Sequence, residues 1–251
     1  MNSSRREQIR ELLCNRPFIS FDELHEMFPG VSNMTLRRDI EYFEEQSEAI
    51  KVRGGARSMK FITTCMEGKF SLRMNENTPA KQKIASVALS LIETERSVFL
   101  DSGTTIFQLA ATMPDERLVV TTTGPNIALE LIKKKLPIVN LVGGMLNRDS
   151  ISVSGNNATK FLADINIDVA FIVPSGASAE TGFTCGNYAE CEFKRQVIEK
   201  ARRTIILADH SKFGRTLPYT FAEFGMVDTI ITDRAVSGDI ADAAKRAGTQ
   251  I

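Results

Sequence analysis

Residues 31–40, with the sequence VSNMTLRRDI, have the composition of a helix that reads DNA. Ser32 is a good N-cap, because its hydroxyl can accept a free backbone N–H of the first turn. Leu36, Ile40 and Phe43 follow at i, i+4 and i+7 and so share one apolar face. Arginine can contact a guanine edge with two hydrogen bonds, and a helix amino end suits phosphate oxygens. We therefore predict a recognition helix whose DNA-contacting residues are Ser32, Asn33, Thr35, Arg37 and Arg38; the alternative is an ordinary solvated charged face.

A second group of polar residues follows the apolar segment 97–100 and has the types that bind phosphate. Gly103 lets the backbone approach a ligand, while Ser102, Thr104 and Thr105 offer hydroxyls. The helix expected after them offers free N–H groups and the positive end of its dipole. Taken alone this is a weak signal, because loops of serine, glycine and threonine are also common helix caps.

Other apolar segments also end in small or charged residues, so the signal repeats along the chain. Ligands of parallel α/β sheets bind at the carboxyl ends of the strands. We therefore predict an anionic small-molecule site whose residues include Asp101, Ser102, Gly103, Thr104, Thr105, Gly143, Ser175, Gly176 and Lys212. Asp101, Asp209 and Lys212 also have the chemistry for acid–base catalysis on a sugar phosphate, so an isomerase is the alternative.

Composition limits the other possibilities. The chain has 251 residues with 31 basic and 31 acidic side chains, which suits one large or two modest globular domains. It has no apolar run long enough for a membrane span, and its polar start is unlike a signal peptide. Four scattered cysteines and two histidines argue against a zinc site or a disulfide framework and fit a reducing cytoplasm. We expect no cofactor, no metal and no membrane partner.

Residues 1–57 have the order of a winged helix-turn-helix domain. Helical spacing of apolar residues appears over 5–14 and again after Ser20, and Pro29-Gly30 makes the turn before the predicted recognition helix. We place the helix-turn-helix at about residues 20–39. Residues 49–53 then alternate before Gly54-Gly55, which predicts a small wing that lays Lys51, Arg53 and Arg57 near the DNA backbone. Because this domain has almost no net charge, we expect a homo-dimer or tetramer to collect enough phosphate contacts.

Residues 58–80 are weakly periodic, and we predict a linker that partly docks on the domain after it. Over residues 81–251, helices alternate with almost entirely apolar strands. The expected strands lie at 97–101, 118–122, 138–142, 169–173, 204–208 and 228–232. This alternation predicts an α/β domain with a Rossmann-like parallel sheet covered on both faces.

These motifs together resemble the DeoR family of bacterial transcription regulators over nearly the whole chain. The N-terminal resemblance lies in Arg5-Arg6, in the TLRRD core of residues 35–39 and in Gly54-Gly55-Ala56. The C-terminal resemblance lies in LDSGTT at 100–105, VGG at 142–144, Lys194-Arg195 and ADHSKFG at 208–214. Arg53 and Pro174 depart from the family's usual residues at the wing and beside the predicted pocket.

The resemblance implies a repressor of a sugar or polyol catabolism operon that a phosphorylated sugar releases from its double-stranded operator. It implies a sensor domain related to ribose-5-phosphate isomerase, in which Ser102, Gly103, Thr104, Thr105 and Lys212 hold the phosphate. It also implies that Glu190 and Lys194 line the same cavity. Two alternatives remain: a sugar-phosphate isomerase with an added N-terminal module, and a metabolite-binding protein that does not bind nucleic acid.

Overall fold

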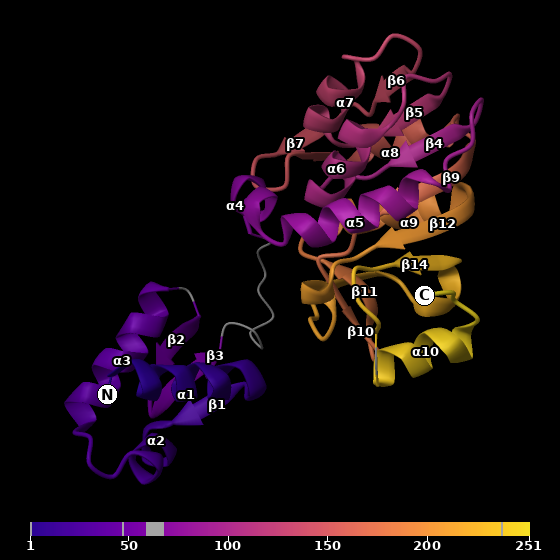
Figure 1. Ribbon diagram of the computed structural model, residues 1–251. Helices are drawn as coiled ribbons and strands as arrows, with labels where there is room; N and C mark the ends of the chain where they lie inside the picture. The colour runs from indigo at the N-terminus through magenta and orange to yellow at the C-terminus, as the bar shows by residue number, and fades with distance from the viewer. Residues whose placement is uncertain (1, 47, 59–67, 237) are drawn as a thin grey trace. The chain divides into compact units, whose positions relative to one another are not determined.

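The computed structural model describes residues 2–46, 48–58, 68–236 and 238–251 (Figure 1). The chain divides into two compact units, Met1–Thr64 and Cys65–Ile251. This division falls inside the predicted linker of residues 58–80, of which 59–67 lie outside the described residues.

The first unit is a winged helix-turn-helix. Its elements are α1 (Asn2–Asn15), β1 (Phe18–Ser20), α2 (Phe21–Met27), α3 (Asn33–Glu45), β2 (Ala49–Val52) and β3 (Gly55–Ser58). The strands form an antiparallel sheet in the order β1-β3-β2. Leu36, Ile40 and Phe43 of α3 are fully buried against residues of α1 and α2, so the predicted apolar face of this helix is confirmed.

Local sequence explains two joints of this unit. Ser20 and Glu23 form a capping box, in which each side chain accepts the other residue's backbone N–H and so fixes the start of α2. Gly55 of β3 pairs with Ser20 of β1, and a Cβ atom there would lie 2.1 Å from the carbonyl oxygen of Ile19. Only glycine fits at that position.

The second unit is built on a six-stranded parallel sheet in the order β14-β12-β9-β4-β5-β6. Its strands are β4 (Ser97–Leu100), β5 (Val119–Thr122), β6 (Ile138–Leu141), β9 (Ile167–Ile172), β12 (Ala201–Leu207) and β14 (Thr229–Ile231). Its helices are α4 (Phe70–Asn75), α5 (Thr78–Leu89), α6 (Thr104–Thr112), α7 (Pro125–Leu131), α8 (Asn156–Ala163), α9 (Tyr188–Lys200) and α10 (Asp239–Ala247).

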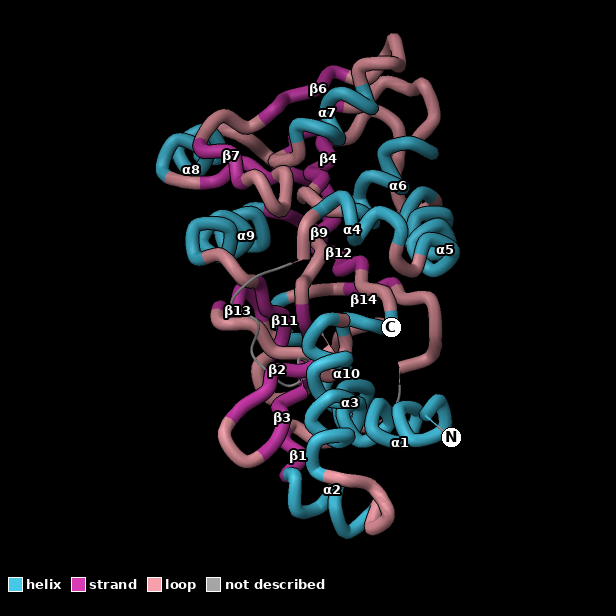
Figure 2. Tube along the Cα trace, turned by 90° about the vertical axis from the view of Figure 1, so that its left-hand side faces the viewer, coloured by secondary structure: helices cyan, strands magenta, loops and turns pink. Residues whose placement is uncertain are grey.

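Helices cover both faces of this sheet, as the apolar strands predicted (Figure 2). One buried cluster joins the sheet to α5, α6 and α7 through Ile84, Ile106 and Ile127. A second cluster joins the other face to α8 and α9 through Leu162 and Phe193. The carboxyl ends of the strands therefore meet at one edge of a sheet whose faces are closed.

Several elements differ from the prediction. Residues 70–75 and 78–80 are helical rather than linker, because Phe70 is buried and Pro79 occupies the first turn of α5. Strand β12 begins at Ala201 rather than at residue 204, since Ala201 and Arg203 already pair with β9. Periodicity did not indicate the short strands that form additional antiparallel pairs: β7 (Met145–Asn147), β8 (Ser152–Ser154), β10 (Gly176–Ser178), β11 (Gly182–Cys185) and β13 (Tyr219–Ala222).

Among the described residues, the helices are all too short or too polar to cross a bilayer. Nor does this part of the chain gather histidine, cysteine and carboxylate side chains into a group that could hold a metal ion.

Candidate functional site

Helix α3 presents the predicted DNA-contacting residues on its outer side. The Ser32 hydroxyl accepts the Thr35 backbone N–H at 3.3 Å and lies 3.0 Å from the Thr35 hydroxyl, so it is the N-cap that the sequence predicted. Asn33, Arg37 and Arg38 are exposed on the first two turns. The Arg37 guanidinium lies 5.4 Å from the centroid of the Phe21 ring, which favours an ordered side chain.

Asp39 follows the two arginines but faces the interior, with 2% of its surface exposed. Its two carboxylate oxygens accept hydrogen bonds from the Nε atoms of Arg5, at 2.6 Å, and Arg6, at 2.8 Å. These ion pairs tie α1 to α3 across more than thirty residues of sequence. Sequence patterns assigned no role to Asp39; in the structure it holds α3 against α1.

The wing is attached to the same helix. Lys51 Nζ lies 2.6 Å from a carboxylate oxygen of Glu41, and the Lys51 backbone N–H donates to Glu44 at 3.0 Å. The charge of Lys51 is therefore paired with α3, whereas Arg53 is exposed at the turn between β2 and β3. Of the three basic residues predicted to lie near DNA, Arg53 and Arg57 are exposed, whereas Lys51 is held by Glu41.

In the second unit, the loop after β4 leads directly into α6. Gly103 is the N-cap of α6, with φ +132° and ψ 165°, and no side chain in the described part of the chain caps this helix. Ser102, Thr104 and Thr105 are all buried. A buried helix amino end without a capping side chain leaves N–H groups that a bound anion can satisfy. These predicted residues therefore form a cradle of hydroxyl and backbone N–H groups at the start of α6, of a kind that can accept an anion.

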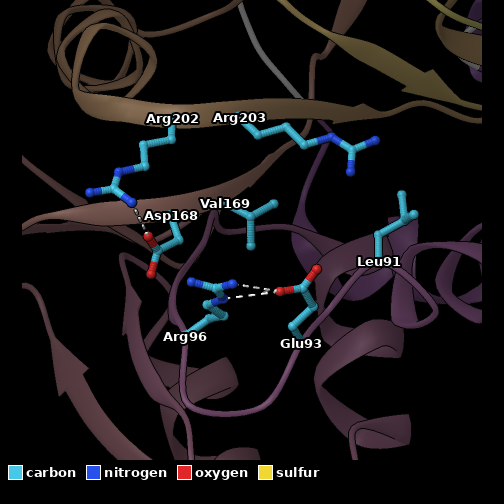
Figure 3. Close-up of a pocket in the computed structure, with 7 residues that line it drawn as sticks. All are labelled: Leu91, Glu93, Arg96, Asp168, Val169, Arg202 and Arg203. Atoms are coloured by element: carbon cyan, nitrogen blue, oxygen red, sulfur yellow. Dashed lines mark hydrogen bonds and ion pairs between the residues drawn. The ribbon is translucent and has the colours of Figure 1, made fainter.

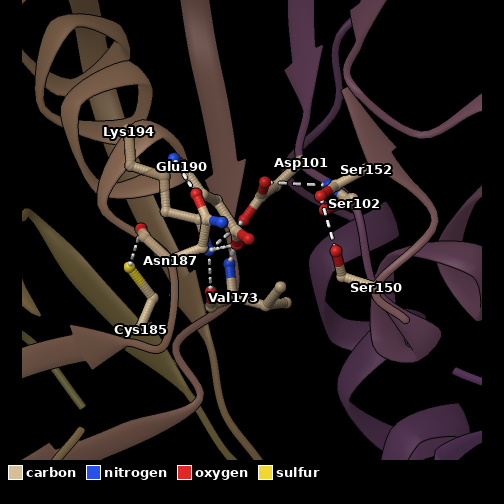
Figure 4. Close-up of polar contacts among 9 residues, drawn as sticks. All are labelled: Asp101, Ser102, Ser150, Ser152, Val173, Cys185, Asn187, Glu190 and Lys194. Atoms are coloured by element: carbon tan, nitrogen blue, oxygen red, sulfur yellow. Dashed lines mark hydrogen bonds and ion pairs between the residues drawn. The ribbon is translucent and has the colours of Figure 1, made fainter. Parts of the chain in front are cut away.

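Beside this loop, Asp101, Glu190 and Lys194 form a buried ionic group (Figure 4). Lys194 Nζ lies 3.0 Å from Asp101 and 2.9 Å from Glu190, and it donates to the Val173 carbonyl oxygen at 2.6 Å. Asp101 also accepts the backbone N–H groups of Ser102 and Val173. This group joins the ends of β4 and β9 to α9. In the structure, these predicted ligand residues therefore stabilise the contact between the sheet and α9.

Helix α9 places Glu190 and Lys194 because its start is fixed by a cap. The Asn187 side chain accepts the Glu190 backbone N–H at 3.0 Å, and Cys185 Sγ contacts the Asn187 carbonyl oxygen at 3.5 Å (Figure 4). Glu190 therefore lies in the first turn of α9 and Lys194 one turn later, on the same face.

Lys212 belongs to a separate polar group at the end of β12. Asp209 is 1% exposed and accepts hydrogen bonds from Ser211 and from the Asn77 side chain. Lys81 of α5 is buried nearby, and its ammonium donates to the carbonyl oxygens of Arg73 and Glu76. Burial lowers the pKa of Lys81; the charge of Asp209 opposes this shift and that of Lys212 adds to it. Lys81 is a candidate effector-site residue that sequence patterns did not reveal.

The remaining predicted ligand residues have different surroundings. Gly176 begins β10, and a Cβ atom there would lie 2.5 Å from the Arg215 carbonyl oxygen. Close approach of the Arg215 backbone therefore explains why this residue is a glycine. The Ser175 N–H donates to the Thr184 carbonyl oxygen at 2.9 Å. Gly143 is exposed, and among the described residues no atom would lie within 4 Å of a Cβ added there. A ligand role for these three residues remains a prediction.

Asn126 is a second candidate that sequence patterns did not reveal. It lies in the first turn of α7, directly after β5, which neighbours β4 in the sheet. Both polar atoms of its side chain are buried and lack a hydrogen-bond partner among the described residues. A buried amide without partners is costly, and a ligand hydroxyl would supply what it lacks.

A hollow at the opposite edge of the sheet makes a poor alternative. It has a volume of about 250 Å³ and is lined by Leu91, Glu93, Arg96, Asp168, Val169, Arg202 and Arg203 (Figure 3). It lies at the amino ends of β4, β9 and β12, and its charges pair with one another, Arg96 with Glu93 and Arg202 with Asp168. Ligands of parallel sheets bind at the other edge.

Two known domain families match the chain. One match lies in the first unit and the other in the second. The family described as the DeoR-like helix-turn-helix domain matches residues 5–61, and the DeoR C terminal sensor domain matches residues 76–234. The putative aga operon transcriptional repressor of Escherichia coli O157:H7 is 31% identical over 99% of this chain and 93% of its own length. The glycerol-3-phosphate regulon repressor of Escherichia coli K12 is 29% identical over 92% of this chain and 90% of its own length.

Among solved structures, ribose 5-phosphate isomerase A from Methanocaldococcus jannaschii is similar over 55% of each chain. The TM-score is 0.41 and the sequence identity is 16%. A likeness of this degree says nothing about activity.

Proposed function

The chain belongs to the DeoR family of transcriptional regulators, and from that premise we propose that it represses a sugar or polyol catabolism operon until a phosphorylated sugar binds its second unit. The first unit binds the operator through α3 and the wing. The second unit is the sensor, and we assign it no catalytic role. The names of the relatives, an aga operon repressor and a glycerol-3-phosphate regulon repressor, support a sugar or polyol pathway as the target.

The amino end of α6 is the observation that carries the effector assignment. It is buried, it begins at a glycine whose conformation brings backbone to the ligand side, and no side chain of the described residues caps it. Helices α7, α8 and α10 also begin at a glycine without a capping side chain from the described part of the chain, but their first turns are more exposed, so it is burial that distinguishes α6. A phosphate at α6 would take the place of the missing cap and interact favourably with the helix dipole.

Helix α4 is the first described helix of the second unit, and it contacts α6. Phe70 begins α4, and its ring lies edge-on to that of Phe107 of α6, with 6.4 Å between centroids. The Phe70 N–H also donates to the Asp149 carbonyl oxygen at 2.7 Å. Lys81 holds the other end of α4 through the carbonyl oxygens of Arg73 and Glu76. We infer that a ligand at α6 shifts the repressor between two states by favouring one docking of α4.

Two measurements test this function together. The protein should slow the electrophoretic migration of the DNA upstream of its own operon at physiological salt. One phosphorylated sugar should release the protein from this DNA. The same sugar should raise the melting temperature of the protein, since a ligand that binds only the folded state stabilises it. Turnover of pentose phosphates would instead favour an isomerase, and absence of any DNA retardation would favour a metabolite-binding protein.

Arg38→Ala tests the recognition helix. If Arg38 makes a bidentate base contact, operator affinity should fall by roughly 1–3 kcal/mol, and discrimination against unrelated DNA should fall with it. Affinity measured at several salt concentrations checks this, with Arg202→Ala in the second unit as the matched control. An equal loss on all sequences, with a shallower salt dependence, would make Arg38 a phosphate contact instead.

Lys212→Ala tests the effector site. Operator binding should be unchanged, while the concentration of sugar phosphate needed for release should rise about tenfold, because one charge that attracts the phosphate is lost. Release curves from the operator measure this, and Lys245→Ala on the exposed side of α10 is the control. Unchanged release by Lys212→Ala would mean that the phosphate lies elsewhere.

A further inference from the structure

Apolar side chains are exposed around the β6 edge of the parallel sheet. We define this edge patch by residues of α7, β6, β7, α8 and the segment before β6: Leu129, Ile132, Leu136, Ile138, Leu141, Met145, Leu146 and Phe161. Each is at least 40% exposed, and Met145 reaches 71%. Figure 1 and Figure 2 place α7, β6 and β7 together at this end of the second unit.

The area of the edge patch is large for a free surface. Summed over these eight residues, the exposed area is on the order of 800 Å², which is about what one partner contributes to a standard protein interface. The largest apolar patch of a typical monomer covers only about 300–600 Å². The patch is therefore of the size that a stable dimer needs.

Strand β6 also has an open backbone edge. It is the last strand of the sheet, and among the described residues no strand pairs with its outer side. The Ile138 N–H donates to Leu118 and the Val142 N–H to Thr122, both toward β5. Because residues alternate along a parallel ladder, the N–H and C=O groups of Val139 and Leu141 point outward.

This edge lacks charged residues, one of the usual protections against pairing, although β6 is short and follows Pro137. Natural edge strands carry charged residues, especially lysine, that prevent another strand from adding to them. Between Lys135 and Arg148 the sequence LPIVNLVGGMLN contains no charged residue. An uncharged open edge inside an apolar patch is typical of a surface that a strand of another chain covers.

We propose that a second copy of this chain occupies the edge patch, with the two β6 strands antiparallel across a two-fold axis near Asn140. In that register, Val139 of each copy faces Leu141 of the other, and these outward-pointing residues exchange both backbone hydrogen bonds of a closely spaced pair. The apolar side chains of α7, β7 and α8 pack around this joint. The parallel sheets of the two copies thereby join into one continuous sheet across the dimer.

A second copy fits this surface better than an unrelated protein, because the edge is complementary to itself. A two-fold axis brings identical donors and acceptors face to face, and isologous dimers are the commonest protein assemblies. A dimer also gives the pair of DNA-binding units that a helix-turn-helix protein with almost no net charge requires. The dimer does not depend on the identity of the effector or of the operator.

Sedimentation of the full chain tests the proposal without DNA. The wild-type protein should have at least twice the 27.8 kDa mass of one chain at micromolar concentration. Leu141→Lys places charge next to the axis in both copies and should raise the dissociation constant about 100-fold or more. Ile138→Lys serves as a second variant, and Met226→Lys, at a residue of similar exposure outside the patch, is the matched control.

The β6 variants should sediment at half the wild-type mass, while the control retains it. Melting temperature and circular dichroism verify that each variant is folded. We expect folded variants because the substituted residues are exposed. A monomeric wild-type chain, or folded β6 variants with unchanged mass, would overturn the proposal. So would a mass change in Met226→Lys equal to that in Leu141→Lys.

Discussion

Asp39→Ala is expected to destabilise the first unit by about 3–5 kcal/mol, because it leaves the charges of Arg5 and Arg6 without their buried partner. The Asp39 carboxylate is almost fully enclosed and accepts hydrogen bonds from both arginines. Removing one member of a buried ion pair costs far more than removing an exposed one. Since the pairs join α1 to α3, operator binding should be lost as the recognition helix loses its support.

Hydrogen exchange measures this effect unit by unit. Backbone amides of α1 and α3 should exchange far faster in Asp39→Ala, whereas amides of the parallel sheet should not change. Glu41→Ala is the matched control, since Glu41 lies on the same helix and its ion pair with Lys51 is exposed. It should cost far less stability than Asp39→Ala, because solvent screens an exposed ion pair. Equal protection of α3 in both variants would show that Asp39 does not hold the helix.

Short-range patterns predicted the elements that carry the site. The serine cap and the apolar positions 36, 40 and 43 define α3 within a single stretch of sequence, and the structure reproduces both. The apolar strands predicted the parallel sheet for the same reason, since burial on both faces leaves few polar positions. The loop that joins β4 to α6 was predicted because glycine and hydroxyl residues lie next to the strand end.

Long-range contacts could not be predicted in this way. The partners of Asp39 lie more than thirty residues away, and those of Lys194 are fixed only once β4, β9 and α9 have come together. Lys81 and Asn126 are single polar residues within helices, and only their burial distinguishes them from solvated side chains. The antiparallel strands β10, β11 and β13 are too short for a periodic pattern to appear.

Gly103→Ala is expected to weaken the response to the effector strongly while leaving operator binding intact. With φ +132° and ψ 165°, Gly103 occupies a backbone region that is essentially restricted to glycine, so a side chain there costs about 1–3 kcal/mol. The new Cβ atom would also lie 2.9 Å from Cγ2 of Val173. The loop must move to relieve both, and the amino end of α6 then no longer meets the phosphate. The apparent affinity for the sugar phosphate should fall about tenfold or more.

Gly238→Ala separates this effect from simple strain. Gly238 is likewise the N-cap of a helix, α10, with φ +65° and no described atom close to a new Cβ, but it lies far along the chain from the cradle residues. Both variants should melt at a lower temperature than the wild type. Only Gly103→Ala should lose the rise in melting temperature that the sugar phosphate produces, because only that substitution alters the amino end of α6. An effector shift that survives in Gly103→Ala, or disappears equally in both variants, would remove α6 as the phosphate site.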